Sequence, residues 1–375
     1  LDLAVQAVDG TKVAANVDKD RTYDAKGLER LLERIEKIIQ QLERENESGN
    51  DPPPVHLPEK LRRAEQLRTE VKSAMQQLTK KGHKCINLTD GDANLMKGRQ
   101  GIIPGYNLEA VVSPLKVDET NKTGVLMTGV ELVPEPEDQK QLIPMMEQSE
   151  EMTGKLADMT LADAGFHSSA NLAACEQRNR VIVMPEAREK TLQNPYHKDR
   201  FNYDANTDSY LCSHGQTLKF IGTRYILKKT VRVYSVPGAV CRRCSAFGIC
   251  TRKSHGRELL IGPYDSELRR HRAWMATEEA KTVYKRRKEL VEPVFGIIKE
   301  QMGVRRFLLR GWSNVQAEAN TLATAFNLRT LWSVWRSRSS EKRRLLVTTI
   351  QELGHKISGA LPILNPYPNQ VLSPG

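Results

Sequence analysis

The sequence predicts an α/β protein in which a mixed sheet is layered with helices and carries two insertions of different character. Short apolar runs alternate with amphipathic helical segments in the order strand, helical hairpin, strands, helix, strand, helix, strand. Residues 201–262 differ, because they are rich in Tyr, Thr, Cys and Gly and read as short strands. With 39% hydrophobic and 27% charged residues among 375, the chain is typical of a folded protein, and global disorder is excluded.

The elements follow in order along the first half of the chain. A short buried strand at 3–8 ends on Asp9. Apolar residues at helical spacing predict helices at about 26–45 and 59–80 around a Pro-rich break at 48–54, so we expect an antiparallel hairpin that serves as a structural arm. The remaining elements are β-type runs at 102–103, 110–112 and 125–127, a helix at 138–150, a strand-like segment at 155–163, a helix at 168–179 capped by Ser168 or Ser169, and a buried strand at 181–184.

The second half begins with the β-rich insertion, for which we expect strands at 209–211, 217–221, 225–227 and 231–233. A long basic helix at about 266–301 and a helix at about 314–335 follow, and then a basic, mobile tail. The expected domains are 1–23 (first core strand), 24–82 (helical hairpin), 83–190 (core), 191–262 (β-rich insertion), 263–336 (core helices) and 337–375 (basic tail).

Charge and cysteine usage narrow the class of protein. The chain has 57 Lys+Arg against 46 Asp+Glu, a net charge of +11, which favours a polyanionic partner. The sequence contains no run of about 18 apolar residues, so it predicts no membrane-spanning helix. Six cysteines are too few for a disulfide scaffold, and we expect a cytoplasmic, reducing compartment. Leu1 stands where a Met would begin a chain and no signal peptide follows, so we expect an upstream segment to be missing.

Four cysteines in the β-rich insertion form a candidate metal site. Cys241-x2-Cys244-x5-Cys250, with Cys212 upstream, could supply the four soft ligands that structural Zn²⁺ prefers. Neighbouring arginines would stabilise the thiolates. The alternative is four reduced free thiols, and His214 and His255 are possible substitute ligands. Cys85 and Cys175 have no other cysteine or histidine at metal-binding spacing, and we expect them to be ordinary buried thiols.

Three acids stand out by their positions, and together they could hold a pair of hard cations. Asp9 and Asp163 end strands, and Glu292 lies on the long basic helix. Taken singly, each acid is explained as a strand-end cap or as a surface acid on a charged helix. A catalytic role needs the three residues together. Cleavage of a phosphodiester uses two Mg²⁺ ions held by a few carboxylates, and two strand ends beneath a helix would provide them.

At these residues the sequence resembles the DDE transposases of bacterial insertion sequences, which have an RNase H-like core. The likeness covers roughly residues 3–332. It rests on Asp9-Gly-Thr-Lys12, Leu161-Ala-Asp163-Ala-Gly-Phe-His167, Val291-Glu292-Pro-Val-Phe-Gly296-x-x-Lys299, Asp90-Gly-Asp-Ala93, Gly105-Tyr-Asn107, Arg305-Arg-Phe-Leu-Leu-Arg-Gly311, Asn327-Leu-Arg329 and the Tyr210-to-Cys250 insertion.

The resemblance implies that Asp9, Asp163 and Glu292 bind Mg²⁺ or Mn²⁺ and that the cysteine region is an insertion before the glutamate helix. It also implies a DNA transposase that cleaves transposon ends and transfers the strands into target DNA, working as a homodimer near the bacterial nucleoid. Two departures stand beside it. Tyr284-x2-Arg287-x4-Glu292-x6-Lys299 has one residue more before the acid than the relatives' signature; alternatively, Lys288 takes the place of the arginine and Tyr284 is one residue out of step. The relatives also have an N-terminal helical segment before the first aspartate, so we expect this sequence to be a truncated copy or a fragment.

A basic stripe around the glutamate predicts where DNA would lie. Phosphate-binding candidates are Lys285, Arg287, Lys288, Lys299, Arg305 and Arg306, with Lys285, Lys288 and Lys299 expected on one face with Glu292. A solvated charged face is the alternative. Two rival functions also stay open: a hydrolytic nuclease on the same core, and a non-catalytic DNA-binding relic.

Overall fold

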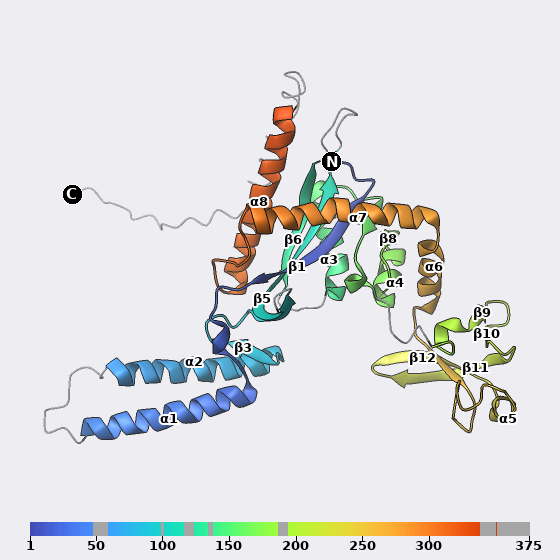
Figure 1. The fold of residues 1–375 in the computed structure, drawn as a ribbon, viewed down its shortest axis with the longest axis horizontal. Helices are drawn as coiled ribbons and strands as arrows, with labels where there is room; N and C mark the ends of the chain where they lie inside the picture. The colour runs from blue at the N-terminus through green and yellow to red at the C-terminus, as the bar shows by residue number, and fades with distance from the viewer. Residues whose placement is uncertain are drawn as a thin grey trace, which may run out of the picture.

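The computed structural model describes residues 1–47, 59–98, 101–115, 124–133, 138–186, 194–337 and 350. Its centre is a six-stranded mixed sheet in the order β4-β5-β1-β7-β8, with β6 also paired to β5 (Figure 1). The pairs of β5 with β1, β4 and β6 are antiparallel, and β1, β7 and β8 run parallel. The strands are β1 (Gln6–Ala14), β4 (Asn94–Gly98), β5 (Gly101–Pro114), β6 (Val125–Val133), β7 (Met159–Leu161) and β8 (Val181–Val183).

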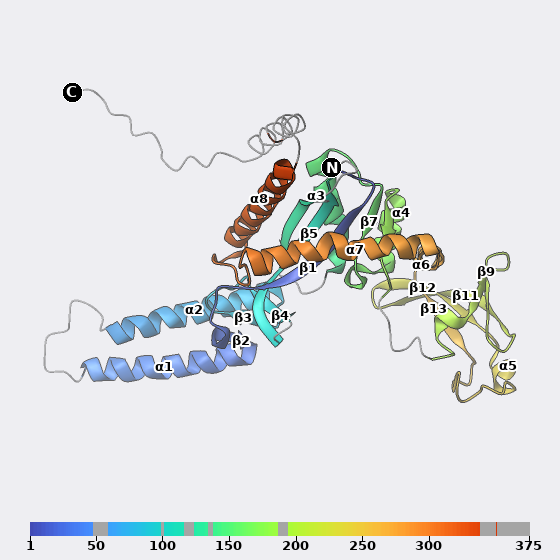
Figure 2. The same ribbon diagram turned by 45° about the horizontal axis from the view of Figure 1, so that its top comes forward.

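Helices cover both faces of this sheet. Successive side chains of β1 point to opposite faces and are apolar on both, so each face needs a covering layer. Ala7 packs against α7 and α8 on one face, and the next residue, Val8, packs against α3 and α4 on the other. Figure 2 shows α7 crossing the sheet, with α8 beside it. Their bounds are α3 (Leu142–Thr153), α4 (Ser169–Gln177), α7 (Glu278–Gly296) and α8 (Trp312–Ser337).

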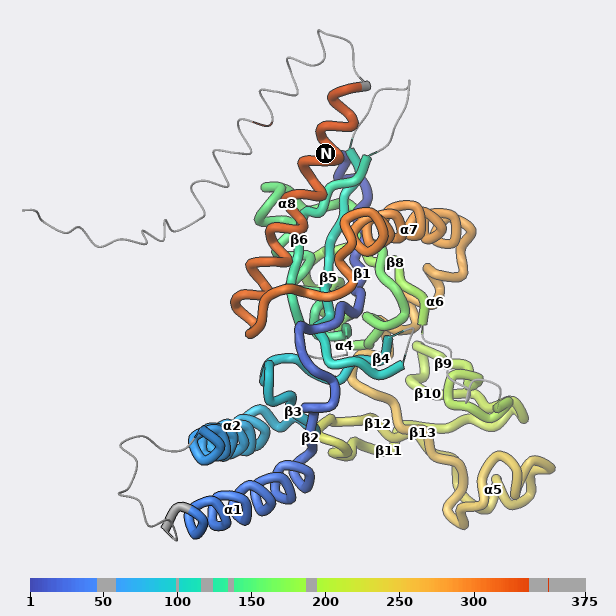
Figure 3. Tube along the Cα trace, turned by 60° about the vertical axis from the view of Figure 1, so that its left-hand side comes forward, coloured from blue at the N-terminus to red at the C-terminus, as the bar shows by residue number. Residues whose placement is uncertain are grey.

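The predicted helical hairpin is present and projects from the core (Figures 1 and 3). Its helices, α1 (Ala25–Glu47) and α2 (Glu59–Lys81), bury one apolar cluster between them. At its base, β2 (Thr22–Asp24) pairs with β3 (Cys85–Asn87). The two strands join the arm to the core.

The β-rich insertion is a separate five-stranded antiparallel sheet with its own small core. Its order is β13-β12-β11-β10-β9, and α6 (Asp265–Met275) leads back to the core. The strands are β9 (Asn202–Asp204), β10 (Ser209–Leu211), β11 (Thr217–Ile226), β12 (Lys229–Ser235) and β13 (Glu258–Ile261), with the short helix α5 (Gly238–Arg242). Single turns elsewhere are η1 (Lys19–Arg21), η2 (Gln139–Gln141), η3 (Ala164–Phe166), η5 (Lys198–Arg200) and the π-turn η6 (Ile297–Gln301).

Several expected elements differ from the structure. The segments expected at 102–103 and 110–112 form one strand, β5, and those expected at 217–221 and 225–227 form one strand, β11. The first strand does not end at Asp9, because β5 is long enough to pair with β1 from Ala7 to Ala14. The long helix expected at 266–301 is broken, because Thr277 caps a new helix by accepting a hydrogen bond from Ala280 N. The Ser168 cap is confirmed, since its side chain accepts from Asn171 N.

No helix in the described part of the chain has the length and apolar character of a membrane span. The expected basic tail at 337–375 lies outside the described residues, apart from residues 337 and 350.

Candidate active site

Two of the three predicted acids lie side by side where β1 and β7 run parallel. Ala7 pairs with Leu161 in this register. Asp9 lies two residues beyond Ala7 and Asp163 two residues beyond Leu161, so the two acids reach the same level of the sheet. Each carboxylate accepts a hydrogen bond from a nearby backbone N–H, at 2.9 Å for Asp9 and 2.7 Å for Asp163. The backbone therefore fixes how both carboxylates point.

Arg287 of α7 reaches between these two aspartates. Its Nη2 lies 2.8 Å from Asp9 Oδ2 and 3.9 Å from Asp163 Oδ2. The Arg287 side chain is 13% exposed and that of Asp9 is 18% exposed, so little water screens the closer pair. Sequence reasoning assigned Arg287 to phosphate binding, whereas the structure pairs it with the acids.

Burial raises the pKa of Asp9 from 3.8 to about 6, against the opposing charge of Arg287 and with a further rise from the neighbouring Asp163 carboxylate. Burial likewise raises the pKa of Tyr284, one helical turn before Arg287. The ionised form of Asp9 is thus disfavoured even with a guanidinium beside it. More positive charge at this point would favour ionisation.

Glu292 lies on the exposed side of α7, with Lys285 and Lys288. It follows Arg287 by five residues, which turns it about 140° around the helix from the residue that faces the aspartates. Among the described residues, no three or more His, Cys, Asp or Glu side chains form a group that could hold a metal ion. The structure thus brings Asp9 and Asp163 together, and Glu292 does not join them in a ready three-carboxylate site.

A buried polar network beside the aspartate pair was not foreseen from the sequence. Glu109 on β5 is fully buried, and the amide nitrogen of Asn107 donates to both Glu109 and Asp138, the latter at 2.7 Å. Lys12 pairs with the same Asp138 oxygen at 2.9 Å. Burial, with the adjacent Asp138 carboxylate, raises the pKa of Glu109 well above its usual range and so favours the protonated form.

One signal in the sequence could have pointed to this network. Glu109 interrupts the apolar run Leu108–Val112, and a charged residue inside a buried strand requires polar partners. Gly10, opposite Glu109 in the register, leaves the space for its carboxyl. A Cβ at Gly10 would lie only 2.6 Å from Glu109 Oε1.

The basic stripe does not share a single face as expected. Lys285 and Lys288 are exposed, whereas Lys299 Nζ donates to Thr11 Oγ1 at 2.5 Å and to the Lys12 carbonyl at 3.1 Å. The π-turn at Ile297–Gln301 changes the angular step per residue and turns Lys299 towards β1. Two further basic residues of the predicted set, Arg305 and Arg306, are exposed beyond the helix, and Arg305 pairs with Glu300.

The four cysteines of the β-rich insertion line one small pocket. A tight turn joins Cys241 to Cys244, whose N–H donates to the Cys241 carbonyl at 3.0 Å. The sulfur of Cys241 accepts a hydrogen bond from Arg257 N, and that of Cys212 accepts one from Gln216 N, both at 3.3 Å. These thiols are among the described residues, none of which form a group that could hold a metal ion, so zinc stays a prediction.

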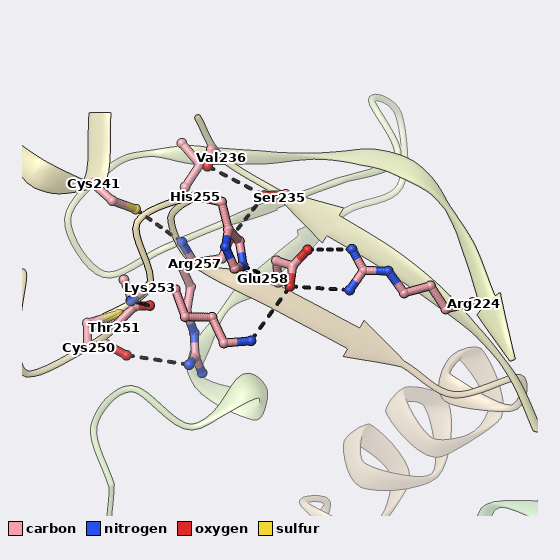
Figure 4. Close-up of polar contacts among 10 residues, drawn as sticks. All are labelled: Arg224, Ser235, Val236, Cys241, Cys250, Thr251, Lys253, His255, Arg257 and Glu258. Atoms are coloured by element: carbon pink, nitrogen blue, oxygen red, sulfur yellow. Dashed lines mark hydrogen bonds and ion pairs between the residues drawn. The ribbon is translucent and has the colours of Figure 1, made fainter. Parts of the chain in front are cut away.

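Arg257, the residue before β13, contacts two of these cysteines (Figure 4). Its N–H donates to Cys241 Sγ, and its guanidinium donates to the Cys250 carbonyl at 3.4 Å. Glu258 pairs with Arg224 of β11 at 2.7 Å, with His255 at 3.3 Å and with Lys253 at 3.7 Å. Of the two histidines named as possible substitute ligands, His214 also lines this pocket and its ring nitrogen hydrogen-bonds to Ser213, whereas His255 pairs with Glu258.

Residues 211–332 match the family model of the transposase DDE domain. Over these residues the chain is similar to the transposase DDE domain. The match runs from the cysteine insertion through α7 into α8, so it contains Arg287 and Glu292 but neither Asp9 nor Asp163. No curated protein and no solved structure matches this sequence. The matched region thus includes the part of the chain that supplies the arginine to the aspartate pair.

Proposed function

We propose that this DDE transposase cleaves transposon ends and joins them to target DNA, with Asp9, Asp163 and Glu292 as its acids. The observation that supports the proposal is that Asp9 on β1 lies beside Asp163, which follows the neighbouring parallel strand β7, with a residue of the matched region between the two acids. An RNase H-like core is supported by the sheet itself, in which the antiparallel strands β6, β5 and β1 are followed by the parallel strands β7 and β8.

The reaction is a pair of displacements at phosphorus. The oxygen of water attacks the phosphodiester at the transposon end, and the 3′ oxygen leaves as a hydroxyl. That hydroxyl then attacks a target phosphodiester, whose own 3′ oxygen leaves. A bound pair of Mg²⁺ or Mn²⁺ ions would stabilise the attacking and leaving oxygens.

The residues of the chain supply position and charge for these steps. Asp9 and Asp163 would hold the cations, and the ion pairs of Arg287 with both aspartates support positive charge at this point. Lys285 and Lys288 stand exposed on α7 next to Glu292, where phosphates of a bound strand can reach them. We also propose a structural Zn²⁺ on the four cysteines and a homodimer that pairs two transposon ends.

A strand-transfer assay tests the proposal. Wild-type protein with Mg²⁺ is expected to join donor 3′ ends to target DNA, and Asp9→Asn and Asp163→Asn are expected to abolish joining while they leave DNA binding intact. An upstream segment should be included where the gene encodes one, because the resemblance places end recognition there. Hydrolysis without joining favours the nuclease, and DNA binding without cleavage by wild type favours the relic.

A further inference from the structure

The β-rich insertion has a one-sided charge that the cysteine pocket does not explain. From Ser209 to Arg257 the chain has no Asp or Glu. The same stretch contains ten basic residues: Lys219, Arg224, Lys228, Lys229, Arg232, Arg242, Arg243, Arg252, Lys253 and Arg257. The whole region β9–β13 also contains Asp204, Asp208 and Glu258, but its basic residues still outnumber its acids, and an excess of positive charge attracts polyanions.

Part of this charge is carried on a hairpin tip that leaves the sheet. Residues 224–231, which we call the ribbon tip, pair only with each other: Arg224 with Val231, Tyr225 with Thr230 and Ile226 with Lys229. β10 pairs with β11 only up to Lys219, and β13 pairs with β12 only from Arg232 onward. No residue of the ribbon tip is buried, so both of its faces meet solvent. The bulge between Phe220 and Gly222 marks where β11 leaves the sheet.

The ribbon tip exposes apolar side chains that folding does not need. Leu227 is 90% exposed and Tyr225 is 75% exposed. The turn has φ values of 48° at Leu227 and 62° at Lys228, a left-handed conformation that residues with a Cβ adopt unfavourably and that Asn-Gly would adopt more easily. A two-stranded hairpin is marginal in water. These features indicate that the ribbon tip has a partner.

The charges at the ribbon tip are available to such a partner. Arg224 is paired with Glu258, and Arg232, just beyond the tip, is paired with Asp208. Within the described residues, neither Lys228 nor Lys229 has an acidic partner, and both are exposed. The ribbon tip therefore presents two exposed lysines beside an exposed aromatic and an exposed aliphatic side chain.

We propose that the ribbon tip is a DNA-binding element that enters a groove of duplex DNA, separate from the basic residues of α7. The proposal rests on the proposed function, which makes DNA the polyanion. A two-stranded β-ribbon fits the major groove, where lysines reach phosphates and apolar side chains reach sugar and base edges. Charge favours this partner over a second copy of the chain, because two tips of like charge repel.

The test is the salt dependence of duplex affinity, measured by fluorescence anisotropy with a labelled duplex. Lys228→Ala/Lys229→Ala is expected to weaken binding and to reduce the slope of log K against log[salt] by roughly 1.8, at about 0.9 for each phosphate that a lysine no longer neutralises. The control, Lys26→Ala/Lys37→Ala, removes the same charge from exposed positions on α1 and is expected to leave the slope unchanged.

Tyr225→Ala separates apolar contact from charge, since it is expected to weaken binding with no change of slope. The inference is overturned if the ribbon lysine variant and the α1 control have the same affinity and slope, or if the ribbon variants change only the sedimentation of the protein and so mark a protein interface. Both results would leave the proposed function standing. A wild-type protein that binds no duplex at all would instead overturn the proposed function.

Discussion

Replacing Asp9 by Asn should stabilise the protein at neutral pH while it abolishes activity. The change keeps the size of the side chain and removes a charge that the folded chain holds at a disadvantage. Burial raises the pKa of Asp9 from 3.8 to about 6, although Arg287 lies 2.8 Å from its carboxylate. Asn has no charge to bury, so the variant avoids this disadvantage.

The size of the stability gain, and the pH range in which it appears, follow from the pKa of Asp9 in the unfolded and folded states. A raised carboxyl pKa means that the folded state binds the proton more tightly than the unfolded state, so folding stability falls as pH rises from 3.8 through 6. At about 1.4 kcal/mol for each tenfold change, ionisation of Asp9 costs about 3 kcal/mol above pH 6. The stability gain of Asp9→Asn should therefore be close to zero below pH 3.8 and approach about 3 kcal/mol above pH 6.

Urea denaturation in EDTA, repeated across this pH range, measures the gain. Asp20→Asn, at an exposed position on η1, is the control and should change stability by less than about 0.5 kcal/mol at every pH. Adding Mg²⁺ should stabilise wild type more than Asp9→Asn, because a ligand that binds only the folded state shifts the equilibrium towards it. The reasoning fails if Asp9→Asn is no more stable than wild type at pH 7.5, or if its gain is the same at pH 4 as at pH 7.5.

Three further predictions concern α7 and the cysteine pocket. Glu292→Gln should abolish cleavage and joining while duplex affinity stays level or rises, with the exposed neighbour Glu289→Gln as the active control; equal cutting by wild type and Glu292→Gln would remove Glu292 from the site. Purified protein should contain about one zinc per chain, and Cys241→Ser should lose it and unfold the β-rich insertion; zinc-free protein with four freely titrating thiols would contradict this. Thr277→Ala should lower the stability to urea by about 1 kcal/mol, since it removes the cap at Ala280 N, and an unchanged denaturation midpoint would show that the cap contributes nothing.

The sequence predicts best where a local pattern decides the structure. The two helices of the arm follow from their apolar spacing, and the Ser168 cap follows from its place before a helix. Asp9 and Asp163 stand out because each follows an apolar run. Their alignment depends on the parallel pairing of β1 with β7, which joins residues far apart in the chain.

The sequence predicts less well where packing or a small irregularity decides the direction of a side chain. An uninterrupted α-helix would place Lys299 with Lys285 and Lys288, but the π-turn after Gly296 changes the angular relation between Lys288 and Lys299. Arg287 looked like one more cation of a DNA-binding stripe. Its pairing with Asp9 depends on the inward face of α7, which the sheet and not the local sequence selects.

Arg287 also explains how the aspartate pair is tolerated without ions. Two carboxylates this close repel each other, and the guanidinium between them offsets that repulsion. The offset is incomplete, because the pKa of Asp9 is still about 6 and its charged form is still disfavoured. The remaining unfavourable energy is what a divalent cation would relieve, since it brings twice the charge of the guanidinium. The stability gain of Asp9→Asn measures this unfavourable energy without changing the volume of the side chain.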